Sequence, residues 1–175
     1  MKVFVVVIVI FVCFTLTMEI KNPFTGKVVF QNYELACSPK DPKAGEGYIS
    51  PKALERLGLV RAYMRKPITI NSSCRSDAHN LAIGGKSGSY HLYENREHGA
   101  CAWDISVRGW SEEDITRLVY LAWNMGYSVG TANSFIHIDD RSYIYGKKQR
   151  FWDYEGYRGI DYQRTVFSKI ARIIS

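Results

Sequence analysis

The sequence contains few of the residues that usually bind metals, and this scarcity narrows the search for a functional site. Histidine and cysteine occur four times each in 175 residues, and no Cys-x-x-Cys pair is present. The lack of such pairs argues against a zinc site built from cysteine thiolates. Because histidine is the commonest metal ligand and general base, its few positions form a short list of candidates for a catalytic centre. They are His79, His91, His98 and His137.

The sequence also lacks internal repeats and low-complexity linkers. A length of 175 residues suits one compact domain and leaves no room for two full cores. Hydrophobic residues make up 46% and charged residues 23%, which excludes a disordered or fibrous chain. We therefore expect residues 19–175 to form a single domain.

No apolar stretch reaches the roughly 20 residues that a membrane-spanning helix needs. The chain begins with Met1 and Lys2, and a shorter apolar run over residues 3–14 follows. This layout is typical of a secretory signal, although no Ala-x-Ala cleavage motif is present. Residues 1–18 are thus predicted to be either a signal peptide or an uncleaved N-terminal membrane anchor. Both alternatives predict an exported domain: periplasmic, secreted or tethered to the outer face of a membrane.

The charge balance favours anionic partners. Twenty-three basic residues against 17 acidic ones give a net charge of +6 and an isoelectric point near 9.1. Cell-wall polymers and membrane surfaces fit this charge, and a merely solvated basic surface is the alternative. The basic and aromatic residues within 147–154 also resemble a nucleic-acid patch. Export argues against that partner, so we expect no nucleic acid, and a membrane contact only if residues 1–18 are retained.

Two amphipathic helices are predicted from their caps and apolar faces. Ser50 precedes Pro51 at the start of the first helix, and its apolar stripe runs to Met64. Ser111 and Asp114 form a capping box for the second helix, over residues 112–125. A brief helix over residues 76–83 and an amphipathic helix over residues 165–174 complete the helical predictions.

Short strands are predicted between these helices, at residues 68–70, 102–107 and 135–139. Several connections are too short for the crossovers that parallel strands require. The sequence therefore predicts an α+β fold with a small antiparallel sheet and flanking helices. Residues 19–48 contain many turn-forming residues and are predicted to be an irregular lead-in wrapped on the domain.

Polar side chains on two of these strands are candidates for the chemistry. Strand alternation puts His137 and Asp139 on one face, opposite the isoleucines of the same strand. Asp104 likewise faces away from Trp103 and Ile105. Because a carboxylate that emerges from a core strand needs a partner, two alternatives remain open at this stage. One is a zinc ion bound by histidines and a carboxylate, and the other is an Asp–His hydrogen bond inside the core.

Several short motifs, taken in order, resemble one known family. They are Ile68-Thr69-Ile70-Asn71-Ser72-Ser73-Cys74-Arg75-Ser76, His79-Asn80, Gly84-Gly85, Ser89-Tyr90-His91, Ala102-x-Asp104 and His137-x-Asp139-x-Arg141. This order is similar to that of the zinc D-Ala-D-Ala carboxypeptidase family, in the branch with a C-terminal-type peptidase domain. The likeness covers roughly residues 33–152. It implies the hedgehog/DD-peptidase fold, one Zn²⁺ ion and a peptidoglycan peptide as substrate.

The resemblance also implies roles for individual residues. His91, Asp104 and His137 match the three zinc ligands, and Arg75 matches an arginine that meets carbonyl or carboxylate groups of the substrate. Asp139 is the first candidate for the general base, because it shares a strand face with His137. The alternative is that Asp139 orients His137 or pairs with Arg141.

Two of the departures from the family pattern bear directly on the candidate site. Twelve residues separate His91 from Asp104, where the family usually has six, and the insert contains His98 as a rival ligand. Ser134 stands where several family branches carry a carboxylate as the general base. If Asp139 does not serve as the general base, Asp140 is the next candidate. The missing acid also keeps a second function open, namely a non-catalytic zinc-containing binding module of the hedgehog type.

The resemblance suggests how the cysteines of the exported domain are used. Cys37 and Cys74 lie in segments that the family packs together, so we expect them to be joined and Cys101 to be free. The alternative is that all three are small buried hydrophobic residues. The resulting hypothesis is a zinc-dependent peptidase of the D,D-carboxypeptidase or endopeptidase type that hydrolyses peptidoglycan stem peptides or cross-links.

Overall fold

The structure is a computed structural model that describes residues 20–21, 28–30, 35, 37, 40–41 and 48–154. The predicted leader, residues 1–18, and the predicted helix over residues 165–174 lie outside these residues. Among the described residues, no helix has the length and apolar character needed to cross a bilayer.

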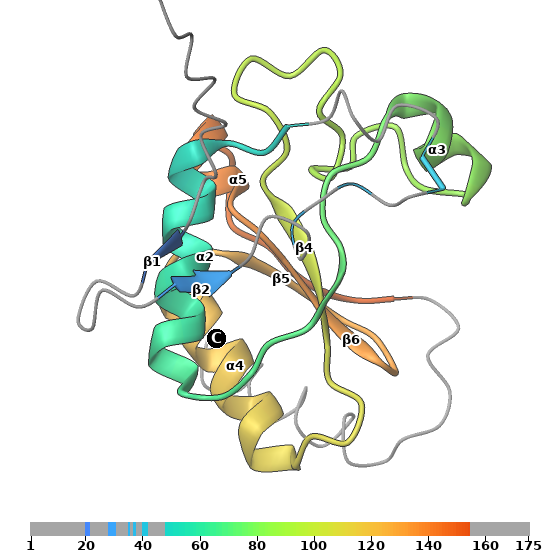
Figure 1. Ribbon diagram of the computed structural model, residues 1–175. Coiled ribbons are helices and arrows are strands. Elements are labelled where there is room, and N and C mark those ends of the chain that lie inside the picture. Colours follow the sequence, from blue (N-terminus) through green and yellow to red (C-terminus); the bar gives the residue numbers. More distant parts are fainter. Residues whose placement is uncertain are drawn as a thin grey trace, which may run out of the picture.

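A five-stranded sheet forms the centre of the fold (Figure 1). Its strands, in spatial order, are β3 (Ile70–Ser72), β4 (Ala102–Ser106), β6 (Phe135–Asp139), β5 (Ser128–Thr131) and β7 (Phe151–Asp153). All neighbouring pairs are antiparallel except β5 and β7, which run parallel. With its flanking helices, this sheet confirms the predicted α+β fold.

Within the described residues, four helices accompany the sheet, and the predicted positions of three are confirmed. They are α2 (Pro51–Met64), α3 (Asp77–Ala82), α4 (Glu112–Asn124) and the short α5 (Arg141–Tyr145). Ser111 caps α4 by accepting the N–H of Asp114. Ser50 is the N-cap residue of α2 and Pro51 follows it, as predicted, but its side chain makes no capping hydrogen bond. Ser50 is instead buried, and its own N–H donates to the carbonyl of Ala100.

The first strand of the sheet begins later than predicted. The structure has β3 at Ile70–Ser72, whereas the apolar run suggested residues 68–70. Ile68 is buried in the core, but the pairing with β4 joins Ile70 to Ile105 and Ser72 to Asp104. Hydrogen bonding to a distant partner therefore sets the bounds of this strand, and hydrophobicity alone could not locate them.

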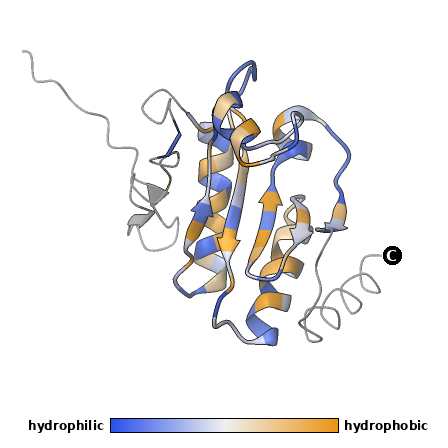
Figure 2. Cartoon of the chain, turned by 90° about the vertical axis from the view of Figure 1, so that its right-hand side faces the viewer, coloured by the Kyte–Doolittle hydropathy of each residue, from blue (hydrophilic) through white to orange (hydrophobic). Residues whose placement is uncertain are grey.

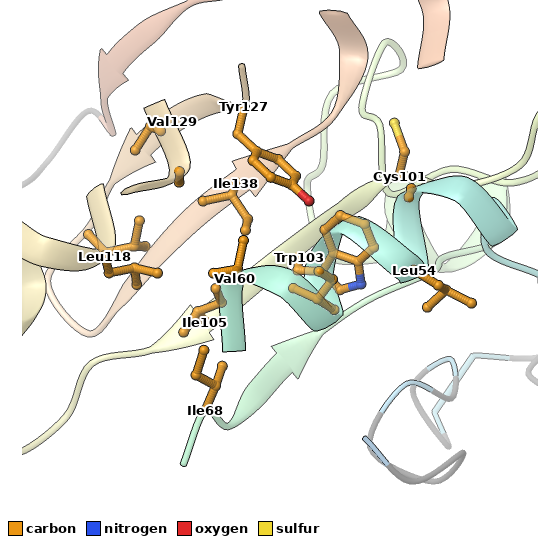
Figure 3. Close-up of a cluster of buried hydrophobic side chains, with 14 of the residues drawn as sticks. Leu54, Val60, Ile68, Cys101, Trp103, Ile105, Leu118, Tyr127, Val129 and Ile138 are labelled. Atoms are coloured by element: carbon orange, nitrogen blue, oxygen red, sulfur yellow. The ribbon is translucent and has the colours of Figure 1, made fainter. Parts of the chain in front are cut away.

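The main core lies between the sheet and two helices. In Figure 1, α2 and α4 lie on one side of the central strands, and α3 lies apart from both. Figure 3 shows Trp103, Ile105 and Ile138 of the strands gathered near Val60 of α2 and Leu118 of α4, and all five are buried. In Figure 2, hydrophobic and hydrophilic segments alternate along these elements, as expected when each element has one buried face.

The described part of the lead-in contains one regular element, and two further contacts tie it to the rest of the domain. β1 (Ile20–Lys21) and β2 (Val28–Phe30) pair as a small antiparallel ladder, although an irregular segment was expected. Cys37 forms a disulfide with Cys74, and Cys101 is free and buried, which confirms the predicted pairing. Asp41 is also buried and accepts the backbone N–H of Ser76 at 2.7 Å. The lead-in is thus fastened on both sides of Arg75.

Candidate metal centre

Two candidate ligands meet because their strands pair in register. Asp104 of β4 lies directly opposite His137 of β6 in the antiparallel ladder. Residues opposite each other in such a ladder project on the same face, with their Cβ atoms about 5 Å apart. The Oδ1 atom of Asp104 accordingly lies 2.8 Å from Nδ1 of His137. The neighbouring residues Trp103 and Ile138 face the core and hold both strands in place.

The third candidate, His91, reaches the site from a loop whose backbone is tied down. The carbonyl of His91 accepts the N–H of Arg75 at 2.8 Å, and the carbonyl of Tyr90 accepts the N–H of Cys101 at 2.9 Å. These bonds place the loop beside the ends of β3 and β4. The Nε2 atom of His91 then lies 3.2 Å from both Oδ1 of Asp104 and Nδ1 of His137.

A turn before His91 depends on the Asn80 and Gly84-Gly85 motifs. Gly84 adopts a φ of +72°, which favours glycine, and the N–H of Gly85 donates to the carbonyl of Asn80 at 2.8 Å. A Cβ atom on Gly85 would lie 2.1 Å from Oδ1 of Asn80, so only glycine fits there. Asn80 also donates its side-chain amide to the carbonyl of Lys86 at 3.0 Å. These motifs thus shape the turn that leads into the ligand loop.

In His91 and in His137, one ring nitrogen contacts a partner outside the cluster. This contact determines which nitrogen carries the lone pair that faces the other two candidate ligands. Nδ1 of His91 contacts the carbonyl oxygen of Ser73 and must donate to it, so its Nε2 carries a lone pair. Nε2 of His137 lies 3.1 Å from the carboxylate of Asp139, which favours a proton on that nitrogen. When His137 is neutral, the Nδ1 lone pair therefore faces the same point as His91 and Asp104.

The three atoms that face one another, Nε2 of His91, Oδ1 of Asp104 and Nδ1 of His137, fit a zinc ion. His91, Asp104 and His137 each offer one ligand atom, all within 4.8 Å of one another, and all three residues are buried. Three converging acceptors without a donor among them are unfavourable unless a cation or a proton joins them. Two imidazoles and one carboxylate suit Zn²⁺ and leave a fourth position open, as in hydrolytic zinc sites.

The pKa shifts within the cluster describe its protonation when no metal is bound. Burial alone would raise the pKa of Asp104, but the charge and hydrogen bonds of His91 and His137 outweigh it and hold this pKa well below its usual value. Burial is the largest influence on His91 and lowers its pKa. Burial acts in the same direction on His137, yet the carboxylates of Asp104 and Asp139 overcome it and raise the pKa of His137 to about 9. A proton on His137 is thus the natural occupant of the cluster when metal is absent.

Asp139 lies on the far side of the His137 ring. It is fully buried, and its two oxygens accept hydrogen bonds from Nε and Nη2 of Arg141 in addition to Nε2 of His137. The backbone N–H of Arg141 donates to the same carboxylate at 3.2 Å. These contacts match the alternative in which Asp139 orients His137 and pairs with Arg141. The role of Asp139 as general base stays a prediction.

Arg75 also belongs to the cluster. Its Nη2 donates to Oδ2 of Asp104 at 2.8 Å, while its Nε donates to the hydroxyl of Ser72 at 2.9 Å. The guanidinium therefore holds the carboxylate oxygen that does not face the histidines. About 13% of the Arg75 side chain remains exposed.

Other sequence candidates lie away from the three ligand atoms. The side chain of His98 is 47% exposed and lies near Glu97, so the structure places His91 rather than His98 in the cluster. The fallback base Asp140 is fully buried and forms an ion pair with Arg56 at 2.6 Å. His79 lies on α3.

Two aromatic residues beside His137 were not assigned to the site from the sequence, which grouped them only with the basic residues within 147–154. The rings of Trp152 and Tyr154 have centres 5.3 and 6.3 Å from the His137 ring. Gly130 makes this possible, because it lies opposite His137 in the ladder and a Cβ atom there would lie 2.5 Å from the indole of Trp152. The alternation of Phe151-Trp152-Asp153 suggested no strand by itself, so only the fold reveals this contact.

Comparison with known proteins adds an independent finding. Residues 28–139 match the family model described as Peptidase M15, and the matched segment contains all three candidate ligands and Arg75. No curated protein matches the chain.

Proposed function

Because the chain belongs to the Peptidase M15 family, we propose that it is a zinc-dependent peptidase that hydrolyses peptide bonds in the stem peptides or cross-links of peptidoglycan. Family membership supports metallopeptidase activity, and the cell-wall substrate is the finer part of the proposal. The observation that carries it is the buried convergence of one carboxylate oxygen and two imidazole nitrogens.

In this proposal His91, Asp104 and His137 hold the metal. When bound, zinc supplies a Lewis acid that polarises the scissile carbonyl and makes a water molecule acidic enough to attack at neutral pH. The protein contributes the fixed positions of the three ligands. The contacts from Ser73 to His91 and from Asp139 to His137 set the two ring orientations before the metal enters.

Arg75 is proposed to orient both a ligand and the substrate. Its bonds to Asp104 and Ser72 use two of its five N–H donors. The remaining donors suit a carbonyl or carboxylate oxygen of the peptide, because the planar fork of a guanidinium binds such groups bidentately.

Asp139 is proposed to act through His137. A carboxylate that already accepts several hydrogen bonds is a weak proton acceptor. Burial raises the pKa of Asp139, but the hydrogen bonds and charges of Arg141 and His137 outweigh burial and lower this pKa below its usual value. Proton transfer by Asp139 remains the competing proposal, and the two differ in their effect on zinc affinity and on kcat.

A non-catalytic binding module is the second candidate function. Ser134 stands at the position of the base in several family branches, and Asp139 is engaged by Arg141. Such a module would bind zinc and cell-wall peptides without releasing products. Retention of Arg75 next to the metal centre favours the enzyme.

We also propose that the chain is exported and that anionic cell-wall polymers are among its partners. The disulfide between Cys37 and Cys74 supports export, because disulfides persist in oxidising compartments. Three exposed cations, Lys147, Lys148 and Arg150, support an anionic partner. They flank Gln149, whose amide donates to the carbonyls of Trp123 and Tyr127 at 2.8 Å and so fixes the loop.

Mass spectrometry of muropeptides after incubation with the purified, zinc-loaded protein tests the proposed activity. We expect shortened stem peptides or separated cross-links, and the mass lost identifies the bond that is cut. His137→Ala is the matched control and should yield no products. Binding to peptidoglycan without any product would favour the non-catalytic module instead.

A further inference from the structure

The segment that separates His91 from Asp104 beyond the usual family spacing contains an arginine directed back at the ligand loop. Nη2 of Arg96 donates to the carbonyls of Gly88 and Ser89 at 3.0 and 2.9 Å. These carbonyls immediately precede Tyr90 and His91. Arg96 therefore fixes the backbone of the loop that carries the first metal ligand.

Aromatic rings hold the Arg96 guanidinium in place. The Cζ atom of Arg96 lies 4.4 Å from the ring centre of Tyr90 and 5.5 Å from that of Tyr145. The Nε atom of Arg96 is buried and has no hydrogen-bond partner. The contacts with the two rings therefore contribute to holding the guanidinium in this position. A guanidinium is attracted to the face of an aromatic ring, and this attraction is stronger when the pair is shielded from water.

The Tyr90 ring is shared with a second arginine that supports the other histidine. The guanidinium of Arg141 lies 4.6 Å from the ring centre of Tyr90. Arg141 also donates two side-chain hydrogen bonds to Asp139, which in turn contacts Nε2 of His137. Tyr90 is thus flanked by the two guanidinium groups that fix the surroundings of His91 and of His137.

The insert contacts helix α5. The hydroxyl of Tyr145, on α5, donates to the carbonyl of Gly99 at 2.6 Å. The N–H of Ala100 donates to the carbonyl of Tyr48 at 3.3 Å. The end of the insert therefore packs against α5 and against the segment before α2.

We propose that Arg96, Tyr90 and Arg141 form a positioning stack in which Arg96 sets the His91 loop and Tyr90 couples it to the support of His137. This inference rests on the metal centre of the proposed function and assigns a role to the insert. None of the three residues supplies one of the three converging ligand atoms, so they act through the ligands. The stack requires arginine rather than lysine at position 96, because a planar guanidinium can stack on a ring and donate from its edge at the same time.

Zinc affinity of the full chain, measured by competition with a chromophoric chelator, tests the stack. We expect Arg96→Ala and Arg96→Lys to weaken zinc binding about tenfold, the lower end of the range for groups that support metal ligands. Arg117→Ala is the matched control, because Arg117 also donates to a backbone carbonyl, that of Tyr63, but on the helix side of the domain. The control should bind zinc like the parent.

The role of Tyr90 is tested by a pair of variants. Tyr90→Leu should weaken zinc binding, whereas Tyr90→Phe should rescue it, because phenylalanine keeps the ring that faces both cations. The absorption spectrum of the cobalt-substituted protein should change in Arg96→Lys and Tyr90→Leu, since ligand geometry changes even when folding is intact. A merely stabilising residue would lower the thermal midpoint of the metal-free protein without altering this spectrum.

Parent-like zinc affinity and cobalt spectra in Arg96→Lys and Tyr90→Leu would overturn the stack. Additive effects of Arg96→Lys and Arg141→Lys in a double-mutant cycle would overturn the coupling through Tyr90. Failure of the parent chain to bind zinc is a different outcome, and it would refute the metal centre itself.

Discussion

Asp139 shows how the surroundings of a single residue limit its chemistry. Two residues along a strand from His137, it shares a face with that ligand, and from the sequence this position suits a base or an orienting group equally. In the structure, Arg141 and Nε2 of His137 surround its carboxylate, while the atom of His137 that faces His91 and Asp104 is Nδ1. The ring of His137 therefore separates the carboxylate from the three converging ligand atoms.

Replacement of Asp139 by asparagine distinguishes the two roles. Asparagine keeps the size of the side chain but loses the charge that pairs with Arg141. We expect Asp139→Asn to weaken zinc affinity by roughly 10–100-fold, with most of the activity recovered at saturating zinc. Asp114→Asn, which removes a carboxylate paired with Lys66 far from the site, is the control. If zinc affinity were unchanged and kcat fell by roughly 10²–10⁴, Asp139 would be the base.

The raised pKa of His137 predicts that zinc binding releases a proton. At pH 7 the metal-free protein retains a proton on this residue, because Asp104 and Asp139 lift its pKa to about 9 from an ordinary 6.5. Metal binding needs the Nδ1 lone pair, so about one proton should leave per zinc at pH 7, and zinc affinity should rise with pH up to about 9. Calorimetry in buffers of different ionisation enthalpy measures this release. Binding enthalpies that do not depend on the buffer would show that His137 is already neutral.

At the scale of elements, the pairing of β4 with β6 creates the site. Alternation within each strand was enough to predict that Asp104 and His137 leave the core face. Their direct opposition depends on the ladder register, which no single strand encodes. The positions of α2, α3 and α4 were predictable because caps, apolar stripes and the Gly84-Gly85 stop are local signals. β7 was not, because its three residues gain a strand conformation only by pairing with β5.

Gly130 in β5 is predicted to be irreplaceable while Trp152 lies across it. A Cβ atom at position 130 would lie 2.5 Å from the indole, so the tryptophan must move away from His137. We expect Gly130→Ala to lower the free energy of unfolding by about 1–3 kcal/mol, as overpacking commonly does. Chemical denaturation measures this loss. In a Trp152→Ala background the same substitution should cost little, and an equal cost in both backgrounds would rule out this contact as the cause.

The disulfide between Cys37 and Cys74 is predicted to stabilise the domain by holding the lead-in beside β3. It closes a loop with a sequence separation of 37 residues. Replacing both cysteines by serine should therefore lower the free energy of unfolding by about 2–4 kcal/mol. Alkylation in denaturant without reductant should label Cys101 and leave Cys37 and Cys74 unlabelled, as seen by peptide mapping. Labelling of all three would show that the bond is absent in solution.

At the scale of the whole molecule, one helical layer supports a site on the opposite side of the sheet. Arg56 of α2 reaches Asp140, the residue after β6, and its guanidinium also lies over the rings of Tyr127 and Tyr143. This contact joins the helical layer to the strand that carries His137. The sequence identified the candidate ligands through family motifs. It could not reveal the partly buried ion pair between Arg56 and Asp140 or the proposed positioning stack, because both join segments far apart in the chain.

Zinc content shows directly whether His91, Asp104 and His137 hold a metal ion. Elemental analysis of the purified parent should find one zinc per chain, because His91, Asp104 and His137 converge on one point. His91→Ala and His137→Ala should lose the metal, while His98→Ala, which changes an exposed side chain of the insert, should keep it. Equal zinc in the parent and in His137→Ala would contradict the account.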